Sequence, residues 1–266
     1  MWGRATRGGS LSGKTRSIIT PSLRLTANNK YVYDTFNQKP TTATKADHQT
    51  AATATDGDEN ILRTDRNMFE YHFIGDQTAV EPSWDANGLD FGINLTSDEG
   101  LEFTSGGIVA RGRNIFTVGT DPAFFLSVTL KITDVTGTDD CLIGFRKVEA
   151  YQAAVDDYDE MAAMNVIQGL ITIETILNDA TAVSTDTTDT WADTATKTLT
   201  VRVSEAGVVT YQNDGAAPTV TAAFTFDDTE VVTPFFYFLH TDHFAETTYL
   251  QGWECGYQTA LGGLAP

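Results

Sequence analysis

The sequence has few of the features that mark disulfide-stapled scaffolds or membrane proteins. Its 266 residues include only two cysteines, too few for a disulfide framework. Cys141 and Cys255 fall in separate predicted strands, which favours a reduced buried pair over a disulfide. No stretch approaches the roughly 20 continuous apolar residues of a membrane span, and no apolar run follows the first charged residues as in a secretory signal. We therefore expect neither a membrane segment nor a secretory leader.

Basic residues are scarce and unevenly placed. The net charge is −19, and no Lys or Arg follows Arg202. Residues 1–55 carry eight Lys or Arg against two acidic residues, a charge of +6, whereas the remainder carries nine against 34, a charge of −25. This split predicts that a basic N-terminal part and an acidic body meet different surroundings. The alternative is that the basic part folds back onto its own body or onto a neighbouring copy.

Two regions of different composition divide the chain. Residues 1–30 have almost no periodic hydrophobicity, and residues 40–58 are rich in Thr and Ala, so neither stretch builds a core. We expect residues 1–58 to form a basic arm and linker. Residues 59–266 are predicted to form one body, since β-sandwiches of roughly 200 to 250 residues are common as single domains.

The body is organised around the stretch Lys197–Asp228. Apolar residues alternate with polar ones from Leu199 to Val203, and turn residues follow at 205–207 and 213–215. This pattern predicts an antiparallel meander with one buried face. A two-stranded ribbon is marginal in water, so the meander needs a larger sheet and a second layer to cover its apolar face.

The same signals predict strands throughout the rest of the body. They lie at 68–74, 89–94, 101–104, 108–111, 115–118, 124–133, 141–149, 165–177, 223–226, 231–240 and 248–257. The run Phe235–Phe238 predicts a strand buried on both faces. Tyr151–Met164 is the one helical candidate, and a loop with one helical turn is its alternative. Many short strands with hardly any helix predict an all-β sandwich or jelly roll.

One motif imitates a nucleotide site. Gly8–Thr15 matches the phosphate-binding loop pattern, but that mechanism needs a buried strand before the loop and a helix after it. Neither context is present in the sequence, so we expect a Gly/Ser arm and no nucleotide. Nucleic acid is also an unlikely partner, because the acidic body repels phosphate.

Candidate metal ligands gather in two places. His240, Asp242, His243 and Glu246 form the best metal-like cluster, but the ligands are crowded into one loop and no distant His or Cys completes them. The acidic residues from Asp156 to Glu160 lack the spacing of a helix-loop-helix calcium site. We expect a polar turn and a solvated acidic face, with no metal and no cofactor.

Catalytic residues are not evident. Paired carboxylates for glycoside hydrolysis would have to face each other across a cleft, and the pattern Glu-x-Asp-x-x-Glu does not occur. Glu174 is expected to be an outward-facing polar residue. The sequence therefore predicts no enzyme. A place in the core is the alternative for the aromatic residues. Among them Trp191, in a loop rich in Thr and Asp, is the best candidate for an exposed sugar platform, with His240 as a second candidate contact.

The C-terminal half, from about Phe124 to Gln258, resembles concanavalin A-like jelly rolls. The segments that carry this resemblance are Thr198–Val203 with Gly207–Gly215, Val231–His240 and Tyr249–Gln258. The same segments, together with Gly144–Gln152, also resemble structural proteins of tailed-bacteriophage virions. The resemblance implies an all-β, concanavalin A-like jelly-roll sandwich with an extended N-terminal arm.

This resemblance and the charge split lead to a non-enzymatic virion protein as the main hypothesis. A capsid decoration or cement protein would lie on the capsid surface after assembly in the host cytoplasm, and would bind the major capsid protein, another virion protein or sister copies, a homotrimer being one arrangement. The arm residues expected to make these contacts are Arg4, Arg7, Lys14, Arg16 and Arg24. The alternative is a carbohydrate-binding module of a phage fibre or appendage, using Trp191 and His240. A glycan-cleaving enzyme on the same fold is the third hypothesis.

Overall fold

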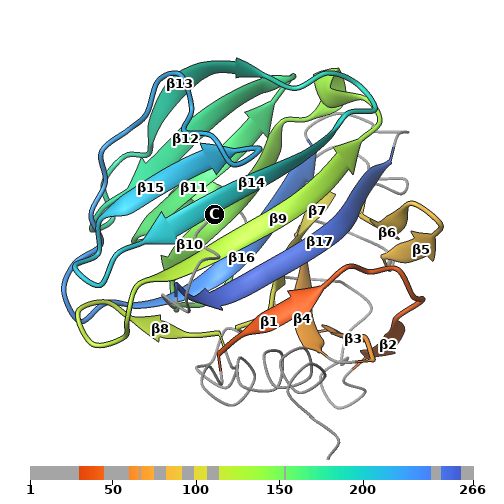
Figure 1. The fold of residues 1–266 in the computed structure, drawn as a ribbon, viewed down its shortest axis with the longest axis horizontal. Helices are drawn as coiled ribbons and strands as arrows, with labels where there is room; N and C mark the ends of the chain where they lie inside the picture. The colour runs from red at the N-terminus through yellow and green to blue at the C-terminus, as the bar shows by residue number, and fades with distance from the viewer. Residues whose placement is uncertain are drawn as a thin grey trace, which may run out of the picture.

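The computed structural model describes residues 30–44, 60–65, 67–74, 82–91, 99–106, 114–152, 154–240 and 247–258. Two antiparallel sheets stack front to back in a sandwich (Figure 1). Neither of the two short helical turns in the described ranges, η1 (Val135–Gly137) and η2 (Val155–Asp157), has the length or apolar character of a membrane span. The prediction of an all-β sandwich is confirmed.

The front sheet in Figure 1 has seven strands and the rear sheet has ten. The seven-stranded sheet runs in the order β15 (Val209–Asn213), β14 (Thr196–Val203), β9 (Phe124–Ile132), β17 (Thr248–Tyr257), β6 (Gly88–Asp90) and β5 (Ser83–Asp85), with β1 (Val32–Asp34) also paired to β17. The ten-stranded sheet runs in the order β13 (Val183–Thr190), β12 (Leu170–Ile176), β11 (Met161–Ile167), β10 (Asp140–Lys147), β16 (Val231–His240), β7 (Glu99–Thr104), β4 (Met68–Ile74), β3 (Asn60–Arg63) and β2 (Thr41–Thr44), with β8 (Phe116–Thr117) also paired to β16.

The predicted meander forms the β14–β15 hairpin at one edge of the front sheet. Val201 pairs with Tyr211, and Gly207 takes a φ of 82° in the connecting turn, a conformation in which glycine avoids the steric cost of a side chain. The apolar side chains from Leu199 to Val203 join the core between the sheets. The stretch that organises the sequence therefore supplies a sheet edge rather than the centre of the fold.

The centre of the ten-stranded sheet is buried on both faces. On β16, Phe236 and Phe238 lie in the core between the sheets, whereas Phe235 and Tyr237 lie in a second apolar cluster. Alternate residues of a strand point to opposite faces, so this second cluster covers the outer face of the sheet. The predicted two-sided burial of this strand is confirmed.

The segment between β10 and β11, residues 148–160, covers that outer face. Val155 and Tyr158 pack in the second cluster together with Leu142 from β10. We call residues 148–160 the strap. In its described residues it contains only the single turn η2, so Tyr151–Met164 is not a helix, and the alternative of a loop with one helical turn describes its first part. Its last residues belong to β11, because pairing with β10 and β12 satisfies their backbone and buries their side chains on both faces.

Two further departures from the predicted strands lie in the neighbouring strands. The run 165–177 is not one strand: it is divided by a tight turn at Gln168 and Gly169, whose φ values are 49° and 81°. The following strand β13 was not predicted, because its sequence is polar. It lies at the edge of the ten-stranded sheet and most of its side chains are exposed.

Strands β1 and β2 precede the expected domain boundary at residue 59. β1 pairs with β17 and β2 pairs with β3, so both belong to the sandwich. Just before β1, Lys30 Nζ lies 2.7 Å from Asp121 Oδ2, and the Tyr31 hydroxyl donates to Glu254 Oε1 at 2.6 Å. The described end of the basic region therefore lies against its own acidic body.

The two cysteines are buried free thiols in different sheets. Cys141 lies in β10 and Cys255 in β17. Burial raises the pKa of both thiols, which keeps them protonated and unreactive. The favoured prediction of a buried, unbridged pair is confirmed.

Substitution of Gly144 tests how tightly β10 and β11 approach. A Cβ at Gly144 would lie 2.2 Å from the carbonyl oxygen of Ala162, whereas one at Gly252 would lie 3.3 Å from the nearest side-chain atom of Thr129. We expect Gly144→Ala to lower the free energy of unfolding by about 2–4 kcal/mol, and the control Gly252→Ala to change it by less than about 1 kcal/mol. Urea unfolding measures both, and equal effects would contradict the packing described.

Candidate functional site

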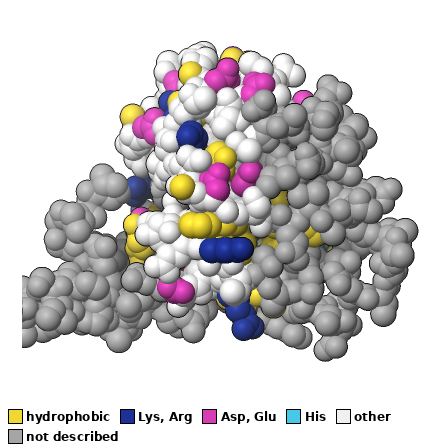
Figure 2. Space-filling model, turned by 90° about the vertical axis from the view of Figure 1, so that its right-hand side faces the viewer, with side chains coloured by type: hydrophobic (Ala, Val, Ile, Leu, Met, Phe, Trp, Pro, Cys, Tyr) yellow, Lys and Arg dark blue, Asp and Glu magenta, His cyan; other side chains and the backbone are white. Residues whose placement is uncertain are grey.

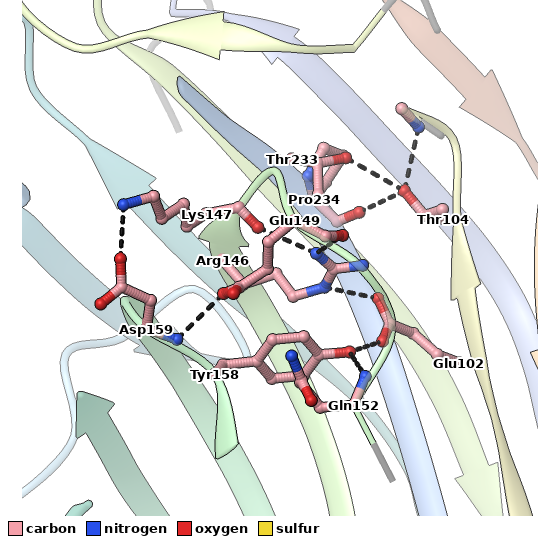
Figure 3. A network of polar contacts seen from close by, with 11 residues as sticks. Glu102, Thr104, Arg146, Lys147, Glu149, Gln152, Tyr158, Asp159, Thr233 and Pro234 are labelled. Carbon is pink, nitrogen blue, oxygen red and sulfur yellow. Dashed lines mark hydrogen bonds and ion pairs between the residues drawn. The ribbon is translucent and has the colours of Figure 1, made fainter. Parts of the chain in front are cut away.

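A charged network lies between the strap and the outer face of the ten-stranded sheet (Figure 3). Arg146 from β10 and Glu102 from β7 form an ion pair with Nε and Oε1 2.7 Å apart, and both side chains are 0% exposed. The Tyr158 hydroxyl, from the strap, donates to the other oxygen of Glu102. The Arg146 guanidinium lies 4.5 Å from the centre of the Tyr158 ring. A residue of the strap is therefore bound directly to the buried ion pair.

The same network holds the two ends of the strap together. Arg146 Nη1 donates to the carbonyl oxygens of Lys147 at 2.8 Å and Glu149 at 3.4 Å. The Asp159 amide donates to Glu149 Oε1 at 2.9 Å, closing the loop (Figure 3). Burial raises the pKa of Glu102, and the neighbouring Arg146 opposes that shift. Because no part of the Arg146 or Glu102 side chain reaches solvent, we assign this network to the stability of the strap.

A double-mutant cycle tests whether Arg146 and Glu102 act as a coupled, buried ion pair. Arg146→Met and Glu102→Met should each lower the free energy of unfolding by about 3–5 kcal/mol, because each leaves one buried charge without its partner. The double variant should lose clearly less free energy of unfolding than the sum of the losses in the two single variants. Lys147→Met is the matched control, since its ion pairs with Asp159 and Glu230 join half-buried side chains, and it should cost about 1 kcal/mol or less. Additive losses in the cycle would contradict a coupled buried pair.

A second group of polar side chains lies on the same face, across β10, β11 and β12. Asn165 donates through Nδ2 to Asp140 Oδ1 at 2.9 Å and to Glu174 Oε1 at 2.8 Å. Its carbonyl oxygen accepts the Cys141 amide at 2.8 Å. Glu174 points to the outer face of the sheet, opposite Ala163, as expected of an outward-facing residue, but it is buried there. Asn165 therefore bridges two carboxylates and uses all three of these bonds to hold adjacent strands together.

Burial is the largest cause of the raised pKa of Asp140, which reaches about 6, and the nearby Glu174 adds to the shift. A carboxyl whose pKa is higher in the native than in the unfolded chain stabilises the fold while it is protonated, and this contribution is lost as the pH rises from about 4 to about 6.

Asp140→Asn removes that titration. Relative to the parent chain, the variant should gain about 2–3 kcal/mol of unfolding free energy between pH 4 and pH 8. Urea unfolding at the two pH values measures this gain, with Glu205→Gln, at an exposed carboxylate, as the control. The same pH dependence in both variants would show that Asp140 is not the group responsible.

Trp191, the best candidate for an exposed sugar platform, is buried. Trp191 is 3% exposed, lies in the core between the sheets, and donates its indole N–H to the Ala195 carbonyl at 3.1 Å. The prediction of an exposed ring at Trp191 is therefore wrong. His240 is the last residue of β16, and its side chain lies outside the described residues, as do Asp242, His243 and Glu246. In the ranges that the structure describes, no three His, Cys, Asp or Glu side chains are arranged to hold a metal ion.

A polar hollow of about 210 Å³ lies where the segment after β1 meets the turn between β3 and β4. It is lined by Tyr33, Asp34, Thr35, Asn37, Gln38, Thr64 and Asp65. Tyr33 is 45% exposed and is the one aromatic residue among the exposed large hydrophobic residues of the described ranges. We call this the Tyr33 hollow.

A set of hydrogen bonds centred on Asp34 fixes the walls of the hollow. Asp34 Oδ1 accepts the Phe36 amide at 2.9 Å, and Oδ2 accepts the Thr64 hydroxyl at 2.5 Å and Asn67 Nδ2 at 2.9 Å. Asn67 Nδ2 also donates to the Tyr33 carbonyl at 2.8 Å. These bonds join two chain segments about thirty residues apart, so the hollow has a defined shape before any ligand binds.

Phe36 anchors the segment after β1 in the core. Its φ is 47°, in the left-handed region that a bulky residue adopts only when its surroundings compensate for the cost. The ring packs 5.4 Å from Phe69 and 6.2 Å from Phe103, between ring centres. The Phe36 carbonyl accepts the indole N–H of Trp84 at 2.8 Å. Strained backbone held by packing is a feature that concentrates at ligand sites.

The remaining lining groups are available to a ligand. No side-chain hydrogen bond to Thr35, Asn37, Gln38 or Asp65 is present in the described part of the chain, and all four are exposed. The walls of the hollow thus offer amide donors, amide acceptors and a carboxylate beside an aromatic ring. No sequence motif marks this group, because its members come from two separate loops.

The sequence matches no protein-family model and no curated protein. Solved structures do match the fold. The carbohydrate recognition domain of Emp46p, in its potassium-bound form, has a TM-score of 0.50 at 9% identity, covering 72% of this chain and 89% of that domain. The carbohydrate recognition domain of Emp47p has a TM-score of 0.46 at 11% identity, covering 87% and 96%.

Botulinum neurotoxin type C, whose cell entry depends on interaction with two ganglioside molecules, has a TM-score of 0.45 at 9% identity. That match covers 88% of this chain and 49% of the toxin chain, so this chain spans about half its length. At these identities the likeness concerns the fold alone. The match to Emp46p confirms the predicted concanavalin-like jelly-roll sandwich.

Proposed function

We propose that this chain is a carbohydrate-binding, lectin-like module that holds a sugar in the Tyr33 hollow. The observation that supports the proposal is an exposed aromatic ring beside free amide and carboxylate groups on a hydrogen-bonded frame. The fold agrees with the proposal, because the matching Emp46p structure is a carbohydrate recognition domain. The alternative expected from the sequence thus becomes the main proposal, at a different place on the body.

Each part of the hollow supplies one element of sugar recognition. The face of an aromatic ring packs against the apolar C–H face of a sugar ring. The amides of Asn37 and Gln38 both donate and accept, so each is suited to a pair of neighbouring hydroxyl groups. The Asp65 carboxylate accepts hydroxyl protons in stronger, charge-assisted bonds. At about 210 Å³, the hollow is smaller than the roughly 300–1,000 Å³ of sites that enclose a whole drug-sized ligand, which suits a single ring or a chain end.

The capsid-decoration role stays a prediction. Arg4, Arg7, Lys14, Arg16 and Arg24, on which it depends, lie outside the described residues, as do the capsid partner and the location on a virion that it implies. The split between a basic N-terminal part and an acidic body is the feature that supports it. Both functions are compatible in one chain, because the Tyr33 hollow begins after the last of these five basic residues. The absence of enzymatic activity also stays a prediction.

Tyr33→Ala tests the carbohydrate proposal. On a glycan array followed by calorimetric titration, the full chain should bind at least one sugar, and Tyr33→Ala should weaken that binding by at least about tenfold, the loss of roughly 1.4 kcal/mol of stacking. Tyr33→Phe keeps the ring and should remain within about threefold of the parent. Because Tyr33 is 45% exposed, both variants should unfold at the parent temperature. Unchanged binding in Tyr33→Ala would place the sugar elsewhere.

A chain that lacks residues 1–29 is the second control. It retains Lys30 and Tyr31, which contact Asp121 and Glu254, and should bind the sugar as the full chain does. The same truncation should abolish association with capsids if the basic residues anchor a decoration protein.

A further inference from the structure

We infer that the Tyr33 hollow selects uncharged sugars and rejects sugars that carry a carboxylate, sulfate or phosphate group. This inference rests on the proposed function and adds the chemical class of its ligand. It follows from the charges on the walls of the hollow, from the bonds that fix them, and from the charge of the whole chain.

The described charged groups that line the hollow are both acidic. Asp34 is the last residue of β1 and Asp65 lies on the β3–β4 turn, and no described Lys or Arg is among the lining residues. Of the basic neighbours in the sequence, Lys39 and Arg63 are exposed and lie outside the lining, and Arg66 lies outside the described residues. Anionic ligands are usually bound through Arg or Lys side chains or through the N-terminus of a helix, and the described walls provide none of these.

The Asp34 charge is fixed in place. Its two oxygens accept three hydrogen bonds, from the Phe36 amide, the Thr64 hydroxyl and Asn67 Nδ2. Rotation of the carboxylate away from a ligand would break these bonds and with them the frame of the hollow. An anionic sugar would therefore meet a carboxylate that does not turn away at low cost.

The rest of the molecule adds to this repulsion. The net charge of the chain is −19, although residues 1–55 carry +6. On the described part of the face in Figure 2, Asp and Glu side chains are interspersed with a few Lys and Arg, without a continuous basic patch that would attract an anion. Long-range attraction of anionic glycans to the body is thus disfavoured at low ionic strength.

Uncharged sugars match the same walls. A hydroxyl group donates to Asp65 and accepts from the amides of Asn37 or Gln38, so one sugar satisfies both kinds of group. Replacing a hydroxymethyl group by a carboxylate removes a donor and adds a charge beside Asp34 and Asp65. Selection against anionic sugars therefore requires no steric exclusion.

The test compares sugars that differ only at C6. The full chain is titrated with glucose and glucuronic acid, galactose and galacturonic acid, and mannose and mannuronic acid, in 20 mM and 500 mM salt at pH 7.5. For the series that binds, the uncharged member should bind at least tenfold more tightly at low salt, and the difference should shrink to a few-fold at high salt, because salt screens exposed charges.

Two variants link the discrimination to the hollow. Asp65→Asn should reduce the difference in affinity between the uncharged sugar and its uronic acid. Asp65→Lys should reduce this difference further or reverse it. Both substitutions are at an exposed position and should leave thermal unfolding unchanged.

The outcomes distinguish the two proposals. Equal or tighter binding of a uronic acid, with Tyr33→Ala still abolishing it, overturns the selectivity and leaves the carbohydrate-binding function standing. An unchanged difference in affinity in Asp65→Asn also overturns the selectivity. Absence of binding to every sugar of the three series and of the array, by a folded full chain, overturns both.

Discussion

The fold depends on burying both faces of strands β10 and β16. An apolar strand at the centre of a sheet needs a cover on each side, and here the seven-stranded sheet covers one side and the strap covers the other. Arg146 is the exception in β10: in place of apolar packing it forms an ion pair with Glu102, which also accepts a hydrogen bond from the Tyr158 hydroxyl of the strap. Burial without this pairing would be costly, so the ion pair and the strap require each other.

The elements predicted correctly are those in which the local pattern of apolar residues indicates which faces are buried. Leu199 to Val203 alternate and form an edge hairpin, and the apolar run Phe235–Phe238 is buried on both faces. The segments predicted wrongly depend on neighbours far along the chain. Met161 and the residues after it have helical composition, but β10 and β12 supply the backbone partners that make them a strand. Trp191 was expected to be exposed to solvent because its neighbours in the sequence are polar, whereas in the structure it packs with the residues of the core.

The candidate site shows the same limit more strongly. None of its members is distinctive alone: Tyr33 is one of nine tyrosines, and Asp34 one of many acidic residues. Their relation to Thr64 and Asn67 arises only when β1 is docked on β17 and β3 is paired with β4. A further signal, the left-handed backbone at Phe36, has no counterpart in the sequence, since aromatic residues seldom adopt it. A site assembled from two loops by tertiary pairing therefore leaves no spacing pattern to find.

The pairing of β1 with β17 has a consequence for the life of the molecule. Val32 lies opposite Cys255, so one wall of the hollow is held by a strand near the other end of the chain. Contacts between such distant residues form late and slowly, since the chain must first close a very long loop. On the ribosome, β17 emerges after all the other strands described here, so the strand that holds β1 in place is the last of them to be made. The shape of the hollow is therefore confined to chains that have completed both sheets.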